Sequence, residues 1–224
     1  MPKPEPPDTL EKPDGVSLAL NFVPLAVIGA GLALARATSD GWLPRGLVFM
    51  AWLYLAPPVI GRLILAIHGR PHGEFGLGTP AYRAWWWLTQ LQMPFNRLPA
   101  LEEVLRLVPG LYPAWIALWG GQLSPLAFVG PRVLITDRYA VRVERGAVLG
   151  FKSALAGHMV TRDAAGRYRI TVAAPVVGAE AIVGGDAGLG PGATLRAGHL
   201  LPTGRRVAAF DTWPRQAALA EEAT

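Results

Sequence analysis

Two long apolar stretches dominate the first third of the chain, at residues 16–35 and 47–67. Each has about twenty residues, enough for a helix to cross a hydrocarbon core of roughly 30 Å. We therefore predict a transmembrane helical hairpin over residues 16–70. Pro57 and Pro58 fall inside the second stretch, where they should kink the helix or end it early. A re-entrant pair of short helices is the alternative interpretation.

Small residues and flanking charges refine this hairpin. Gly29 and Gly31 would let another helix approach the first closely. Residues 1–15, rich in proline and charged side chains, are expected to form a solvated tail. More lysines and arginines flank the hairpin than lie in the loop between its two stretches. The positive-inside rule then places both termini on the cytoplasmic side of a bacterial-type inner membrane.

The segment at residues 71–122 has a different pattern. Four apolar residues in it recur at the spacing of one helix face: Leu101, Val104, Leu105 and Val108. Three adjacent tryptophans, Trp85 to Trp87, precede them. We expect short helices that lie in the membrane interface, with the tryptophans as anchors. Binding of a polyprenyl or lipid substrate is the alternative role for this tryptophan cluster.

A six-residue repeat occupies the second half of the chain. Aliphatic residues recur in one phase at six positions: Val177, Val183, Leu189, Leu195, Leu201 and Val207. An earlier block has the same period with one shift: Val129, Ile135 and Val141, then Val143, Leu149 and Leu155. A fixed period of this kind is typical of a solenoid, in which six residues make one flat strand and a turn. We predict a β-helix over residues 123–210 that faces the cytoplasm, followed by a tail over 211–224.

The two blocks of repeats are separated by a segment that breaks the period. Residues 163–166 read Asp-Ala-Ala-Gly, which is a turn signal, and residues 167–172 resemble a strand. We interpret residues 158–175 as a loop extruded from one coil. A solenoid of about four coils exposes apolar ends and sides, so self-association is also expected.

Composition supports membrane association and excludes several classes of site. Hydrophobic residues make up 51% of the chain and charged residues 17%, against roughly 25% charged residues in an average soluble domain. The chain has no cysteine, which excludes disulfides, thiolate metal sites and cysteine nucleophiles. The net charge is +5, but dispersed arginines do not indicate a nucleic-acid partner. Anionic lipid, a phosphate-bearing ligand or membrane topology alone would explain this charge.

Three segments carry a resemblance to a known family: residues 135–141 (Ile-Thr-Asp-Arg-Tyr-Ala-Val), residues 155–160 (Leu-Ala-Gly-His-Met-Val) and the regular run 177–207. Together they resemble the hexapeptide-repeat acyltransferases, in particular the sugar O-acetyltransferase branch. The resemblance implies a left-handed parallel β-helix, a homotrimer, and acetyl-CoA or another acyl-CoA bound between neighbouring β-helices. It also implies that His158 is the general base and that Asp137 orients it or binds the acceptor. An imidazole suits this task because its pKa lies near neutral pH.

The resemblance also suggests where the cofactor binds. We assign Gly184, Gly190, Arg205 and Arg206 as acyl-CoA contacts. The two arginines would hold a CoA phosphate, or alternatively form a solvated cap on the solenoid. No metal site is predicted, because the γ-class carbonic anhydrases of this fold use three histidines and the repeats here contain only two, the second being His199.

Two hypotheses of function follow. The first is a membrane-associated acyltransferase that modifies a hydroxyl or amine of a sugar or lipid-linked acceptor. The second is a non-catalytic scaffold whose partners are other subunits of a larger, possibly energy-transducing, membrane complex. The second hypothesis is favoured by residues 177–186, which lack the asparagine and aromatic residues usual in the family. Under both hypotheses, membrane lipids surround the hairpin.

Overall fold

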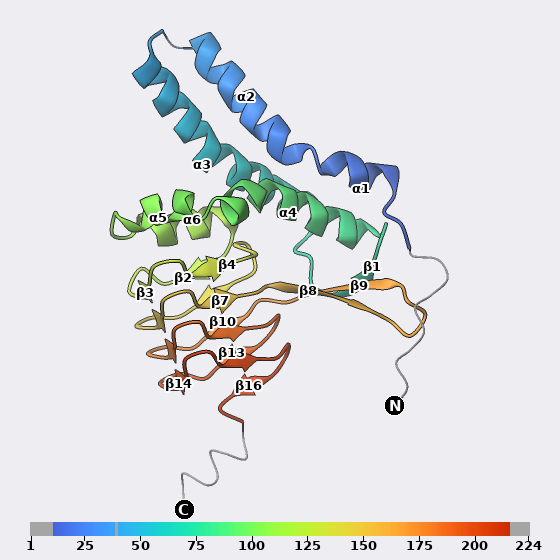
Figure 1. Ribbon diagram of the computed structural model, residues 1–224, viewed down its shortest axis with the longest axis vertical. Coiled ribbons are helices and arrows are strands. Elements are labelled where there is room, and N and C mark those ends of the chain that lie inside the picture. Colours follow the sequence, from blue (N-terminus) through green and yellow to red (C-terminus); the bar gives the residue numbers. More distant parts are fainter. Residues whose placement is uncertain (1–10, 39, 216–224) are drawn as a thin grey trace, which may run out of the picture.

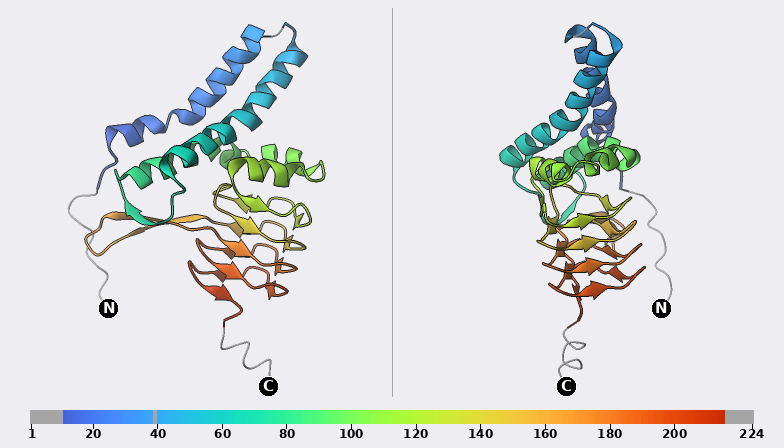
Figure 2. Two further views of the ribbon diagram at one scale, coloured as in Figure 1. Left: turned by 180° about the vertical axis from the view of Figure 1, so that it is seen from behind. Right: turned by 90° about the vertical axis from the view of Figure 1, so that its left-hand side faces the viewer.

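The computed structural model describes residues 11–38 and 40–215, which form a helical N-terminal region and a β-solenoid (Figure 1). The helices are α1 (Gly15–Leu20), α2 (Val23–Thr38), α3 (Trp42–His68), α4 (Pro80–Arg97), α5 (Ala100–Arg106) and α6 (Leu111–Trp119). Helices α2 and α3 project together from one end of the molecule, and α4, α5 and α6 lie across the first coil of the solenoid (Figures 1 and 2).

The first predicted span is two helices rather than one. Helix α1 ends at Leu20, residues 21–22 form a turn, and α2 begins at Val23 and has 16 residues. Polar contacts with α4 hold this break: Gln90 Nε2 donates to Asn21 Oδ1 at 3.2 Å, and Trp86 Nε1 donates to the carbonyl of Ser17 at 3.0 Å. The prediction of one continuous helix over residues 16–35 was therefore wrong, because α1 turns aside to pack on α4.

The second apolar stretch forms one uninterrupted helix of 27 residues, α3, with Pro57 and Pro58 buried inside it. Of the two predicted effects of these prolines, an early end of the helix was wrong, and a kink stays a prediction. Among the described residues, α3 is the one helix long and apolar enough to cross a membrane. In its most apolar segment of 18 residues, 22% is buried within the chain. Length and composition alone support that assignment.

Close approach of α2 to α3 depends on one of the two predicted glycines. A Cβ on Gly31 would lie 2.6 Å from Cδ1 of Trp52, whereas a Cβ on Gly29 would meet nothing within 4 Å. The Trp52 indole N–H also donates to the carbonyl of Val27 at 2.9 Å. Gly31 is thus the contact point of this helix pair, and Gly29 faces away from it.

Helices α4 to α6 cap the solenoid. Thr79 begins α4 by accepting a hydrogen bond from the N–H of Tyr82 at 3.1 Å. The helix then buries Leu88, Leu91 and Phe95 almost completely. These side chains, together with α6, close one end of the solenoid core.

Two features of this cap were not indicated by the sequence. Trp85 is only 3% exposed, so it is a core residue rather than a surface anchor. In α5, Leu105 and the charged Glu102 are buried, whereas Val104, and Val108 in the turn after α5, are more than half exposed. Glu102 turns inward because it binds an arginine of the first coil, and this contact overrides the apolar pattern.

Two-residue strands build the solenoid in three parallel sheets. The first sheet, from its helical end, contains β2 (Gln122–Leu123), β5 (Arg142–Val143), β10 (Val176–Val177), β13 (Thr194–Leu195) and β16 (Thr212–Trp213). The second contains β3 (Phe128–Val129), β6 (Val148–Leu149), β11 (Ile182–Val183) and β14 (Leu200–Leu201). The third contains β4 (Leu134–Ile135), β7 (Ala154–Leu155), β12 (Gly188–Leu189) and β15 (Arg206–Val207).

The predicted repeat residues form the solenoid core. The second residue of most strands points inward and is almost fully buried, as Leu149, Val183 and Leu201 are. Each stacks on its equivalent in the next coil, as the parallel register of Leu149 with Val183 shows. The described strands make four coils and begin a fifth. The predicted β-solenoid after a helical region is therefore confirmed, and its flat six-residue sides are those expected of the left-handed form.

Two irregularities interrupt the six-residue period, and each comes directly after a strand of the third sheet, the first after β4 and the second after β7. Ile135 and Val143 are separated by two residues more than the repeat requires, and Leu155 and Val177 by a much longer insertion. The insertion forms an antiparallel hairpin of β8 (His158–Arg162) and β9 (Tyr168–Val172), with a turn at Asp163–Gly166. A further strand, β1 (Gly73–Gly76), pairs with β9 and ties the helical region to the hairpin. The sequence indicated the turn and β9 but contained no sign of β1.

Candidate active site

The two irregularities lie one coil apart at the same corner, and they bring His158 to Asp137. Gly157 stacks directly on the first irregular segment: a Cβ at Gly157 would lie 2.7 Å from Cβ of Asp137 and 3.1 Å from the carbonyl oxygen of Ala140. Only glycine fits this close approach. The missing side chain leaves room for the carboxylate beneath the start of the hairpin.

His158 and Asp137 form a hydrogen-bonded pair. His158 Nδ1 is 2.6 Å from Oδ2 of Asp137, whose side chain is 1% exposed. The same oxygen accepts from the Thr136 hydroxyl at 2.6 Å, and that hydroxyl accepts from the N–H of Gly157 at 3.2 Å. An ionised carboxylate makes Nδ1 the donor, which leaves Nε2 of the neutral ring as an acceptor. This tautomer is the one a general base requires.

The surroundings of His158 tune its protonation. Burial lowers the pKa of His158, but the hydrogen bond and negative charge of Asp137 raise it by more, so the pKa lies above its ordinary value of 6.5. The side chain remains 25% exposed. No described residue hydrogen-bonds to Nε2 of His158, so this nitrogen is free to meet a substrate.

An aromatic side chain fixes the ring of His158 from the side of α4. The edge of Trp85 packs against it, with ring centroids 5.2 Å apart and planes at 65°. Trp85 in turn contacts Tyr82 at 5.8 Å and Phe75 of β1 at 6.5 Å between centroids. The imidazole therefore lies between a buried carboxylate and an aromatic side chain, and both contacts restrict its orientation.

A buried ionic network holds the segment that carries Asp137. Arg138 is fully buried, and its Nε donates to Oε1 of Glu102 at 2.8 Å, a carboxylate that Nη2 also contacts. Its Nη1 donates to Oδ1 of Asn96 at 2.9 Å, and its backbone N–H to Oε1 of Gln92 at 2.7 Å. Sequence analysis missed this role, although Arg138 lies in the segment that carries the family resemblance.

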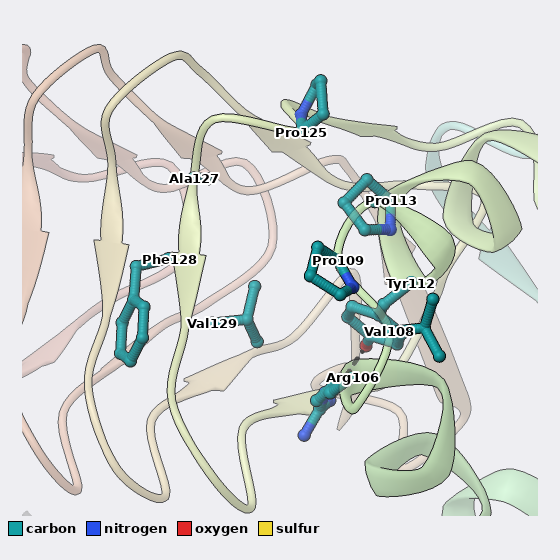
Figure 3. A pocket seen from close by; sticks show the side chains of 10 residues that line it. Arg106, Val108, Pro109, Tyr112, Pro113, Pro125, Ala127, Phe128 and Val129 are labelled. Atoms are coloured by element: carbon teal, nitrogen blue, oxygen red, sulfur yellow. Dashed lines mark hydrogen bonds between the residues drawn. The ribbon is translucent and has the colours of Figure 1, made fainter.

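The second oxygen of Glu102 completes the network. It accepts from the Tyr112 hydroxyl at 2.6 Å and from Nη2 of Arg106 at 3.1 Å. Figure 3 shows Arg106 and Tyr112 together at a recess of about 260 Å³ beside the first coil. Arg106 is already paired with Glu102 and with Glu103, and no described residue that lines the recess is a base, so this recess has no evident chemistry.

Two buried polar atoms near His158 have no partner among the described residues: Oδ1 of Asp137 and the hydroxyl of Tyr139. Burial and the charge of Asp137 raise the pKa of Tyr139 well above its ordinary value, so this phenol stays neutral. Unsatisfied buried groups cost stability. Retaining a carboxylate under this cost is typical of a functional site rather than of a structural core.

The other predicted site residues lie outside the His158–Asp137 pair. A Cβ on Gly184 would lie 2.6 Å from the backbone nitrogen of Thr203 in the next coil, so Gly184 permits the coils to stack closely. Gly190 has the same role at the next corner of the coil, where a Cβ would lie 3.0 Å from the backbone nitrogen of Ala209. Arg205 lies over the ring of Trp213, 4.8 Å from its centroid. Arg206 is on β15, two strands from β7 in the third sheet. Their role as acyl-CoA contacts remains a prediction.

Metal-binding potential is a separate question. Within residues 11–38 and 40–215, no group of three or more His, Cys, Asp or Glu side chains is placed to hold a metal ion. His199 hydrogen-bonds through Nδ1 to the carbonyl of Ala197 at 2.8 Å on the solenoid surface.

Comparison with known proteins gives little further guidance. No protein-family model and no curated protein sequence matches the chain. Among solved structures, serine acetyltransferase isoform 3 from Entamoeba histolytica is 11% identical, with 99% of this chain and 92% of that chain covered and a TM-score of 0.25. Serine acetyltransferase from Neisseria gonorrhoeae is 13% identical, covering 86% of this chain and 75% of that chain, with a TM-score of 0.23. The functional assignment therefore rests on this chain's own residues.

Proposed function

We propose that this chain is a membrane-associated acyltransferase that moves an acyl group from acyl-CoA to a hydroxyl or amine of a sugar or lipid-linked acceptor. One observation carries the proposal: a buried carboxylate, Asp137, lies 2.6 Å from Nδ1 of a partly exposed histidine, His158. A histidine oriented in this way serves as a general base toward a substrate hydroxyl.

The chemistry follows from the two ring nitrogens of His158. As the acceptor oxygen attacks the thioester carbonyl carbon, its proton moves to Nε2, and Asp137 stabilises the imidazolium through Nδ1. The C–S bond of the tetrahedral intermediate then breaks. The imidazolium returns the proton to the departing CoA sulfur, so the base is regenerated within one cycle.

The third sheet offers a strip on which CoA could lie. The outward residues of its inner strands are small, Ala154 on β7 and Gly188 on β12, and they are paired in register. Arg206 on β15 continues the same row, and its guanidinium occupies the space that a side chain at Gly188 would take. The guanidinium therefore covers the row at Gly188, on the strand next to β7, and a phosphate of CoA would have to meet it there.

Membrane association is part of the proposal. Helices α2 and α3 expose large apolar side chains to the surroundings, each more than half accessible: Leu25, Leu32, Leu47, Leu55 and Leu63. Such a surface requires lipid or a protein partner. A bilayer around α2 and α3, on the cytoplasmic-membrane topology predicted from charge, would place α1, α4 and the His158 site next to the headgroups.

The same apolar surface favours a second candidate function. Packed against other membrane proteins, α2 and α3 would make the solenoid a rigid, non-catalytic scaffold in a multi-subunit complex. The oligomeric state distinguishes the two. Gentle detergent extraction of the native chain, followed by sizing and mass spectrometry, should yield a homo-oligomer for the enzyme and fixed stoichiometry with unrelated subunits for the scaffold.

Release of free CoA tests the catalytic assignment. The full chain in detergent micelles is incubated with acetyl-CoA and a panel of sugar and lipid-linked hydroxyl acceptors. His158→Ala should lower CoA release by about 10²–10⁴-fold, the usual contribution of a general base. His199→Ala is the matched control, because His199 lies on the solenoid surface, and should leave the rate unchanged. Equal rates for the wild type and His158→Ala would contradict the proposal.

A further inference from the structure

An apolar pocket of about 240 Å³ lies between α4 and the β8–β9 hairpin, beside the His158 site. Its lining is mostly aromatic and aliphatic, including Tyr82, Trp85, Trp86, Val160, Tyr168 and Ile170. The N-terminal segment closes one side through Pro13, held there by an ion pair of 2.8 Å between Asp14 and Arg83.

Strand geometry connects this pocket to His158. Alternate residues of a strand point to the same face, so His158 and Val160 share a face of β8. On β9 their register partners are Val172 and Ile170, which pack in one cluster with Trp85. Because Trp85 lines the pocket and also contacts the His158 ring, a ligand in the pocket lies one aromatic ring away from the imidazole.

The polar atoms of two pocket walls already have hydrogen-bond partners within the chain. Tyr82 and Trp86 stack at 6.2 Å and 11°, and the Trp86 indole N–H is bound to the carbonyl of Ser17. The hydroxyl of Tyr168 accepts from Nη2 of Arg162 at 2.9 Å. By contrast, Nε1 of Trp85 is buried with no partner among the described residues.

From this arrangement we propose that the pocket binds a medium-length alkyl chain whose polar end lies at His158. At about 30 Å³ for each water-sized group, the volume holds roughly eight such groups, comparable to a chain of about eight carbons. This inference rests on the proposed acyltransfer. It narrows the substrate class, since either the acyl donor or the acceptor carries a hydrocarbon chain.

Photo-crosslinking in lipid nanodiscs tests the pocket directly. Two diazirine-bearing probes are used, a decanoyl-CoA and a decyl alcohol, and labelled residues are mapped by mass spectrometry. Labelling is expected on the pocket walls, at Val160, Ile170 or Trp86. Val160→Trp fills the pocket and should abolish this labelling. Thr161→Trp is the matched control, because Thr161 is exposed on the opposite face of the same strand, and should label like the wild type.

The two probes separate the sources of the chain, and a parallel assay separates the two proposals. Wall labelling by the CoA probe alone assigns the chain to the donor, and by the alcohol alone to the acceptor. Labelling that misses the walls, or that persists in Val160→Trp, overturns the pocket inference. If CoA release from acetyl-CoA still depends on His158 in that case, the acyltransferase proposal stands without the pocket. Wall labelling without any His158-dependent release would instead keep the alkyl-chain pocket and overturn the acyltransferase proposal.

Discussion

The buried network around Glu102 makes a quantitative prediction. Glu102→Ala removes the carboxylate that receives hydrogen bonds from Arg138, Arg106 and Tyr112. Arg138 is fully buried, so the substitution leaves a cation without its partner inside the fold. Removing one member of a buried ion pair costs about 3–5 kcal/mol. For a chain of this size, each kcal/mol lowers Tm by roughly 2–4 °C, so the expected loss is about 6–20 °C.

Thermal unfolding of the detergent-solubilised chain, followed by circular dichroism, measures this loss. Arg142→Ala is the control: it removes a surface ion pair with Glu144 of the same type, 2.7 Å long, with the arginine 56% exposed. Surface pairs contribute about 0–1 kcal/mol, so Tm should fall by no more than about 4 °C.

The double variant Glu102→Leu/Arg138→Met tests the cause. Because it removes both charges, it should recover much of the Tm lost in Glu102→Ala. The explanation fails if Glu102→Ala is no worse than the surface control. It also fails if the double variant is less stable than Glu102→Ala, since the loss would then come from packing rather than from an unpaired charge.

Two further predictions concern single contacts. Asp137→Asn removes the charge that raises the pKa of His158. Because the base must be neutral to act, the rising limb of the pH–rate profile should move to lower pH, and the maximal rate should fall. An unmoved limb would argue against the pairing of Asp137 with His158. Gly31→Val should destabilise the α2–α3 pair by collision with Trp52, whereas Gly29→Val, with open space at its Cβ, should not; equal Tm values for the two variants would refute this distinction.

Much of the solenoid could be predicted from sequence because its information is local. A single inward residue per six positions defines each strand, and stacking identical positions fixes the register. The two departures from that period, after Ile135 and after Leu155, were also visible in sequence. They proved to be the most informative feature of the chain, because irregular segments at one corner bring Asp137 and His158 together.

The remaining features depend on contacts between distant segments. Glu102 and Arg138 lie in segments that look unrelated in sequence, so nothing in the sequence indicated that they meet in the core. The break between α1 and α2 depends on hydrogen-bond partners on α4, such as Gln90 for Asn21. The hydropathy of the segment alone does not predict these contacts. Strand β1 exists because β9 offers it an edge. Each of these depends on a tertiary partner rather than on local propensity.

The separation between a capped end and a repetitive end has an evolutionary consequence. The His158–Asp137 pair is built entirely from the corner of the first two coils, the start of the hairpin and α4. In a solenoid, each coil contacts only its neighbours. Whole coils added beyond β15 would therefore lengthen the chain without moving the reacting groups or the arginines proposed to contact CoA. Relatives of this protein should vary in length at that end while keeping the corner that carries Asp137 and His158 unchanged. The same end is where coils could be added by design without disturbing the site.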